Sequence, residues 1–158
     1  MIAGRVLAGL VGLALLSASS SRAESQKEVE AIVDAFQANL RAGDRAKVLE
    51  LLDENVIIFE GGGAELSRDE YAHHHLAGDM EFVAATKSTT TRRVSELVGE
   101  AAWVTTLSRT SGEFRGKTIA TRNAETIVLR RAATGWRIVH IHWSSRADAP
   151  VPPASKKP

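Results

Sequence analysis

The sequence has no cysteine in 158 residues and only 5% aromatic residues, and neither sign of charge dominates its composition. Without cysteine, disulfides, thiolate metal sites, iron–sulfur clusters and a cysteine nucleophile are excluded. A formal net charge of +1 gives no support to a nucleic-acid or anionic-membrane surface. With 44% apolar and 25% charged residues, the composition is that of one ordinary globular domain. Any chemistry must therefore come from histidine, carboxylate, arginine and hydroxyl groups.

Long apolar runs are also missing, apart from a short one near the N-terminus. Arg5 precedes an apolar run over residues 6–16, and a stretch of small and polar residues follows it. This order is that of a secretory signal peptide, and the run is shorter than the roughly 20 residues that a membrane-spanning helix needs. We predict a signal peptide over residues 1–23, a mature chain that begins near Glu24 without a membrane span, and a periplasmic or secreted location.

After residue 24, the sequence pattern predicts helices first and strands afterwards. Apolar residues at three- and four-residue steps predict a helix over 25–41, and Asp44 is suited to cap a second, short helix. A β-branched stretch over 56–60, ended by three glycines, predicts a short strand. Ser67 and Glu70 form a capping box that opens a third helix over 68–84.

Four segments rich in Thr, Val, Ile and Trp follow and are separated by glycine turns. They predict an antiparallel meander over residues 86–98, 101–111, 117–131 and 135–146. We expect an α+β fold over residues 24–146, in which a curved antiparallel sheet wraps around the helices as a cone with an internal pocket. Residues 147–158 hold the prolines and two lysines of a disordered tail.

The C-terminal stretch carries a resemblance to a known family. Glu125-Thr126, followed by Trp136-Arg137-Ile138-Val139-His140-Ile141-His142-Trp143-Ser144, resembles the end of the association domain of calcium/calmodulin-dependent protein kinase II. It is also similar to small stand-alone proteins of the nuclear transport factor 2-like, or SnoaL-like, superfamily. The resemblance implies a cone-shaped fold, dimerisation through the sheet, and a cavity that different members use for isomerisation, cyclisation, ligand binding or oligomerisation.

In the kinase domain an arginine follows the Glu-Thr pair, within a cavity noted for arginines. Ile127 stands at that position in this sequence, which puts an arginine pocket of that kind in doubt. Arg109, Arg122 and Arg130 are the candidates to replace it, against the alternative that each is a solvated strand residue.

All five histidines lie in two places, His73-His74-His75 on the third predicted helix and His140 and His142 on the last strand. Strand alternation predicts that both strand histidines share a face with Trp136 and Ile138. His75 and Asp79 are four residues apart and project from the same side of a helix. If the helix crosses the sheet, His75, Asp79, His140 and His142 converge on a Zn²⁺ or Cu²⁺ site. The alternative is that the strand histidines are hydrogen-bonded core residues.

Three functions remain open. The first is an exported protein, expected to be a homodimer, that binds a small organic ligand or a metal ion in a cavity lined by Tyr71, His75, Phe82, Trp136, His140 and His142. The second is an isomerase, cyclase or dehydratase in which His75 or His142 is the general base and Glu125 orients an imidazole. The third is an oligomerisation scaffold. His73 is expected to be exposed, and His74 to lie at the pocket rim or at a subunit interface.

Overall fold

The computed structural model describes residues 10–148. Residues 1–9 and 149–158, which hold the start of the expected signal peptide and most of the expected tail, lie outside the described residues. The chain begins with α1 (Leu10–Ala42), α2 (Arg45–Leu51), β1 (Leu52–Glu60), β2 (Gly63–Glu65), α3 (Arg68–His74) and α4 (Leu76–Ala85). Four long strands follow: β3 (Thr86–Val98), β4 (Ala101–Phe114), β5 (Lys117–Ala132) and β6 (Gly135–Ala147).

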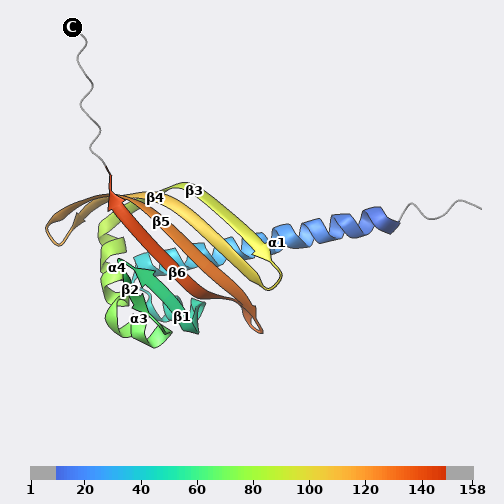
Figure 1. Cartoon of the computed structure of the whole chain (residues 1–158), viewed down its shortest axis with the longest axis horizontal. Coiled ribbons are helices and arrows are strands. Elements are labelled where there is room, and N and C mark those ends of the chain that lie inside the picture. Colours follow the sequence, from blue (N-terminus) through green and yellow to red (C-terminus); the bar gives the residue numbers. More distant parts are fainter. Residues whose placement is uncertain (1–9, 149–158) are drawn as a thin grey trace, which may run out of the picture.

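The strands form one curved six-stranded sheet in the order β2-β1-β6-β5-β4-β3 (Figure 1). The predicted antiparallel meander is confirmed, since β3 to β6 pair in sequence order. The expectation of a wholly antiparallel sheet is wrong at one place, because β1 runs parallel to β6 while β2 folds back antiparallel onto β1. Parallel pairing needs a long crossover connection, and α3, α4 and the meander supply it.

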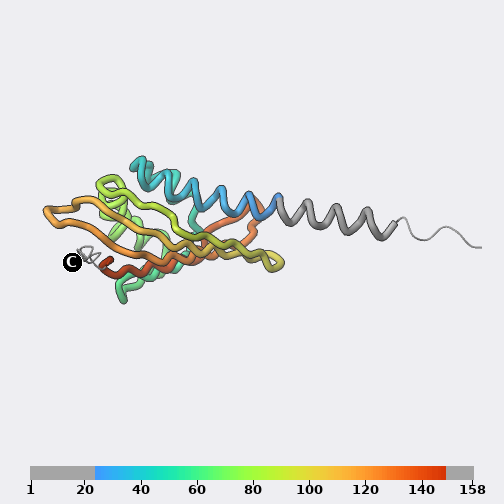
Figure 2. The backbone as a smooth tube through the Cα atoms, turned by 90° about the horizontal axis from the view of Figure 1, so that it is seen from above, coloured from blue at the N-terminus to red at the C-terminus, as the bar shows by residue number. Residues whose placement is uncertain are grey.

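The helices cover one face of the sheet, which we call the inner face; the opposite side is the outer face (Figures 1 and 2). α1 runs along the inner face and buries Val29, Val33, Phe36 and Leu40 completely. These side chains pack in one hydrophobic core with inward residues of β4, β5 and β6, and Leu97 of β3 packs against this core. The predicted α+β architecture is therefore confirmed. No helix in the described part of the chain is long and apolar enough to cross a membrane.

The local signals for helix ends are confirmed, but the third helix is broken. The Asp44 side chain accepts a hydrogen bond from the Lys47 amide, and the Ser67 hydroxyl accepts one from the Glu70 amide. The single predicted helix over 68–84 is instead α3 and α4, with a break at His75. His75 has φ −108° and ψ −33°, and its imidazole contacts Glu65 of β2. A tertiary contact therefore interrupts a pattern that local propensity would continue.

Candidate active site

A cavity of about 180 Å³ opens on the inner face, where β1, β2, α3 and β6 meet. Apolar and aromatic groups form part of its wall, and two carboxylates, a phenol and an imidazole form the rest. The lining residues are Ile58, Glu60, Gly63, Ala64, Glu65, Tyr71, His75 and Trp143. The cavity thus contains Tyr71 and His75, which the sequence predicted, and adds Glu60, Glu65 and Trp143, which it did not.

A buried carboxylate holds the imidazole of His75. Glu65 is only 6% exposed, and its two carboxylate oxygens contact Nδ1 of His75 and Nδ1 of His74, the latter at 3.3 Å. An Nδ1–H that donates to Glu65 leaves the lone pair of a neutral imidazole on Nε2. Fixing the tautomer and the ring in this way is how a carboxylate prepares a histidine for proton transfer. The geometry therefore suits His75 as a general base, with Glu65 as its positioning residue.

A second pair joins α3 to α4 beside this imidazole. The hydroxyl of Tyr71, whose side chain is completely buried, donates a hydrogen bond of 2.8 Å to Oδ2 of Asp79. Burial raises the pKa of Asp79, while the hydrogen bond from Tyr71 and the nearby His75 oppose that rise. Burial, together with the negative charge of Asp79, also raises the pKa of Tyr71. The phenol therefore stays protonated and remains a hydrogen-bond donor.

Glu60 ends β1 at the edge of the cavity. Its side chain is exposed, but the surrounding protein removes part of the hydration of the carboxyl. This loss of hydration raises the pKa of Glu60, the charge of Asp79 raises it further, and His75 opposes both. A carboxyl whose pKa is raised keeps its proton to a higher pH than an ordinary glutamate, and while protonated it can donate a hydrogen bond or a proton.

Trp143 connects the cavity to a partly buried carboxylate in the middle of the sheet. Its indole Nε1 donates a 2.8 Å hydrogen bond to Oε2 of Glu125, and Nε2 of Gln37 on α1 donates to the same oxygen at 2.5 Å. Burial raises the pKa of Glu125, and these donors oppose the rise. Glu125 therefore positions the indole of Trp143, and the expectation that it orients an imidazole is wrong.

The two strand histidines lie on the outer face, contrary to the prediction. In β6, Ile138 pairs with Leu129 and His140 pairs with Val128, so Val139 is an extra residue and forms a β-bulge. The bulge shifts the alternation by one residue, so Ile141 and Trp143 point inward while His140 and His142 point outward. The outward rings of His140 and His142 contact Phe59 of β1, at centroid distances of 5.2 Å and 6.2 Å.

The predicted zinc or copper site is therefore not assembled. His75 and Asp79 lie on the inner side, whereas His140 and His142 lie across the sheet from them. Within residues 10–148, no group of three or more His, Asp or Glu side chains is arranged to hold a metal ion.

Other candidate residues lie outside the cavity. Phe82 packs edge-on against Phe114, at 5.3 Å between ring centroids. Trp136 is 3% exposed in the core, away from the cavity lining. His73 is exposed, as expected, and its Nδ1 lies 2.6 Å from the carbonyl oxygen of Asp69. His74 is also exposed and contacts Glu65 at the cavity rim.

The three candidate arginines do not form an inner pocket either. Ile127, at the position where the kinase domain has arginine, is completely buried in the core. Arg130 pairs with Asp53 at 3.0 Å near the start of β1. Arg109 and Arg122 pair instead with Asp148 on the outer face.

Comparison with known proteins agrees with the fold. The sequence matches the family described as SnoaL-like domain over residues 29–148. Among solved structures, a proposed ketosteroid isomerase from Shewanella frigidimarina is 39% identical, with a TM-score of 0.69 over 72% of this chain and 91% of that one. No curated protein matches the sequence.

More distant structures share the fold. The hub of calcium/calmodulin-dependent protein kinase II from S. rosetta is 23% identical, with a TM-score of 0.64 over 77% of this chain and 96% of that one. A proposed dehydratase of the NTF2-like family from Streptomyces avermitilis is 18% identical, with a TM-score of 0.64 over 80% of this chain and 99% of that one. The resemblance to association domains and to NTF2-like proteins is thereby confirmed.

Proposed function

Because the chain belongs to the SnoaL-like domain family, we propose that it is an enzyme that moves a proton on a small carbonyl compound, as an isomerase or dehydratase does. The observation that carries the proposal is one cavity in which a carboxylate-backed imidazole, His75 with Glu65, faces a carboxyl with a raised pKa, Glu60. Two relatives of this fold, named as a proposed ketosteroid isomerase and a proposed dehydratase, point to the same class of chemistry.

In the proposed reaction, Nε2 of His75 removes a proton from the carbon next to the carbonyl group. The C–H electron pair forms a carbon–carbon double bond, and the carbonyl electrons move to oxygen. In its protonated form, which the raised pKa of Glu60 favours, Glu60 donates a hydrogen bond to this oxygen and stabilises its developing charge. Glu65 balances the imidazolium that forms.

Two outcomes follow from the same enolate. If His75 returns its proton to the γ-carbon of a β,γ-unsaturated substrate, the product is the conjugated isomer. If the β-carbon carries a hydroxyl group, that group takes the proton of Glu60 and leaves as water. The apolar wall formed by Ile58 and Trp143 suits the hydrocarbon part of either substrate.

The size of the cavity limits the substrate. Pockets for drug-sized ligands measure about 300–1,000 Å³, whereas this one measures about 180 Å³. We therefore propose a substrate with one small ring or a short chain, which is smaller than a steroid.

The experiment is a proton-exchange assay with cyclopentanone in D₂O, followed by NMR, together with isomerisation of a β,γ-unsaturated cyclohexenone followed by ultraviolet absorbance. We expect catalysis by the wild type and a loss of about 10²–10⁴-fold in His75→Gln. His73→Gln is the matched control, because His73 is an exposed histidine of the same helix outside the cavity. Saturable binding of both ketones without exchange or isomerisation would favour a binding protein instead.

We also propose that the outer face forms a homodimer. Ile57, Phe59 and Trp103 are 39%, 41% and 37% exposed, although they are large and apolar. Ile57, His140 and Trp103 lie in one row across the strands, and Phe59 and His142 lie in the next outward row. Large exposed apolar side chains gathered on one face of a sheet in this way are typical of an interface. The similarity to association domains supports a second copy of this chain as the partner.

We further propose that the protein acts outside the cytoplasm. The signal-peptide pattern over residues 1–23 supports this, and cleavage near Glu24 leaves the buried part of α1 from Val29 onward in place.

A further inference from the structure

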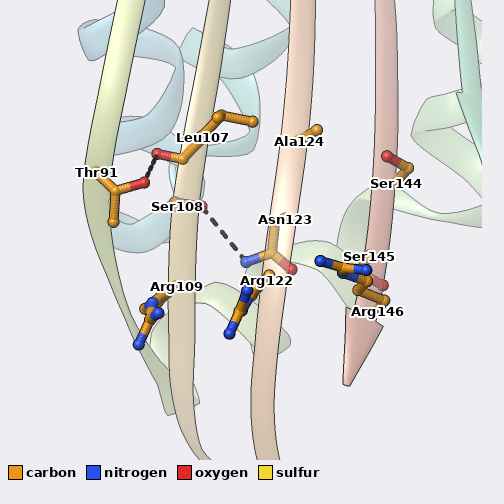
Figure 3. A pocket seen from close by; sticks show the side chains of 10 residues that line it. All are labelled: Thr91, Leu107, Ser108, Arg109, Arg122, Asn123, Ala124, Ser144, Ser145 and Arg146. Carbon is orange, nitrogen blue, oxygen red and sulfur yellow. Dashed lines mark hydrogen bonds between the residues drawn. The ribbon is translucent and has the colours of Figure 1, made fainter. Parts of the chain in front are cut away.

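Three arginines stand side by side on the outer face, one on each of three neighbouring strands (Figure 3). Arg109 of β4 pairs directly with Arg122 of β5, which pairs directly with Arg146 of β6. We call this row the arginine row. It lies six residues along each strand from the row of Trp103 and His140, and on the opposite side of the sheet from the cavity that contains His75.

Like charges directly opposite one another destabilise a sheet, so such a row requires negative charge. Asp148, just after β6, supplies part of it. One carboxylate oxygen of Asp148 lies 2.5 Å from Nε of Arg122, and the other lies 3.4 Å from Nη1 of Arg109. These arginines, with Arg146 nearby, also lower the pKa of Asp148. One carboxylate against three guanidinium groups leaves an excess of positive charge.

A hollow of about 580 Å³ adjoins the arginine row. The next outward row consists of Leu107, Ala124 and Ser144, whose side chains are neutral and, at two of the three positions, small. Thr91 of β3 closes one side, where its hydroxyl donates a hydrogen bond of 3.1 Å to the carbonyl oxygen of Leu107 (Figure 3). The hollow therefore has a cationic end and an adjoining floor that is mostly apolar.

We propose that this hollow is a second binding site, for a small amphiphilic carboxylate whose charged group occupies the position of the Asp148 carboxylate. The guanidinium groups of Arg109 and Arg122 already hold the two oxygens of one carboxylate, so they present the donor geometry that a ligand needs. The apolar body of the ligand lies over Leu107 and Ala124. Asp148 is an internal competitor that occupies the arginines when the ligand is absent.

The ligand class follows from both ends of the hollow. A neutral amide of the same shape lacks the charge that the arginine row attracts, and inorganic phosphate lacks the apolar body. Phenylacetate has both features, so we use it as the probe, with 2-phenylacetamide and inorganic phosphate as the comparisons. Because the site lies across the sheet from His75, its test does not depend on the proposed enzyme activity.

The experiment is a titration of the mature protein with each probe, followed by calorimetry and by NMR of the backbone amides. We expect saturable binding of phenylacetate, with shifts in residues of β4, β5 and β6 around the arginine row. Phosphate and the amide should bind at least about ten-fold more weakly, as the loss of a charge-assisted hydrogen bond or of apolar burial predicts.

Three variants decide the assignment. Arg122→Gln should weaken phenylacetate binding about ten-fold or more, because it removes one of the two guanidinium groups that hold the carboxylate. Asp148→Asn should strengthen it several-fold, because the competitor loses its charge. Arg130→Gln, an exposed arginine of the same strand that pairs with Asp53, should leave it unchanged. An absence of saturable binding in the wild type and Asp148→Asn, or equal losses in Arg122→Gln and Arg130→Gln, would overturn the proposal.

Discussion

Replacing Tyr71 by Phe removes a single hydroxyl group from the core and leaves the ring in place. The hydroxyl of Tyr71 donates a hydrogen bond of 2.8 Å to the Asp79 carboxylate, and no part of the Tyr71 side chain reaches solvent. A hydrogen bond to a charged group contributes about 1.5–3 kcal/mol. Because Asp79 is only half-buried and water can reach it, we expect a loss of about 1.5–2 kcal/mol in the free energy of unfolding.

The loss should also depend on pH. The hydrogen bond from Tyr71 lowers the pKa of Asp79, against the burial that raises it, so Tyr71→Phe raises this pKa further. The penalty is therefore present above the folded-state pKa of Asp79, where the carboxylate is charged, and shrinks as the pH falls through that pKa. Urea unfolding of the wild type and of Tyr71→Phe at about pH 8 and at about pH 5 measures the loss of unfolding free energy with Asp79 more and less ionised.

A double-mutant cycle with Asp79→Ala separates this hydrogen bond from other effects of the two substitutions. The account predicts a coupling free energy of about 1 kcal/mol or more between Tyr71 and Asp79 at the higher pH. A coupling indistinguishable from zero, or a Tyr71→Phe penalty that grows as the pH falls, would refute the reasoning.

Three further predictions concern other parts of the molecule. Burial raises the pKa of Glu125, so the wild type loses stability as the pH rises through that raised pKa. In urea unfolding, Glu125→Gln should lose less stability over the same pH range, and an unchanged pH dependence would contradict this prediction. Trp103→Glu puts a charge into the proposed dimer interface and should give a monomer in analytical ultracentrifugation. A dimer that persists in this variant would contradict the assignment of the outer face as the interface. Intact mass of protein exported by its natural host should match a chain that begins near Glu24; retention of residues 1–23 would contradict the signal-peptide prediction.

Much of the fold could be predicted because its signals are local. The caps at Asp44 and Ser67 and the glycine-separated strands depend on residues that are close in sequence. The parallel pairing of β1 with β6 could not be read in this way, because it joins segments about eighty residues apart and leaves no local pattern.

The candidate site was predicted only in part, for two physical reasons. The bulge at Val139 has no glycine or proline to announce it, so strand alternation assigned His140 and His142 to the wrong face. The second reason is that three consecutive glycines indicate a turn but do not reveal the short strand that follows it. β2 folds back on β1 and places Glu65 opposite Ile58, with Glu60 on the same side of the strand, so both carboxylates lie on the inner face.

The central claim is that the protein catalyses proton transfer with His75 as the base and Glu60 as the acid. The most direct measurement is the pH dependence of cyclopentanone exchange in the wild type and in Glu60→Gln. The wild-type rate should fall as the pH rises through the raised pKa of Glu60, because ionised Glu60 no longer donates to the enolate oxygen. Glu60→Gln should be slower and should lack this alkaline fall. An identical pH profile in the two proteins, or exchange that His75→Gln leaves intact, would contradict the account.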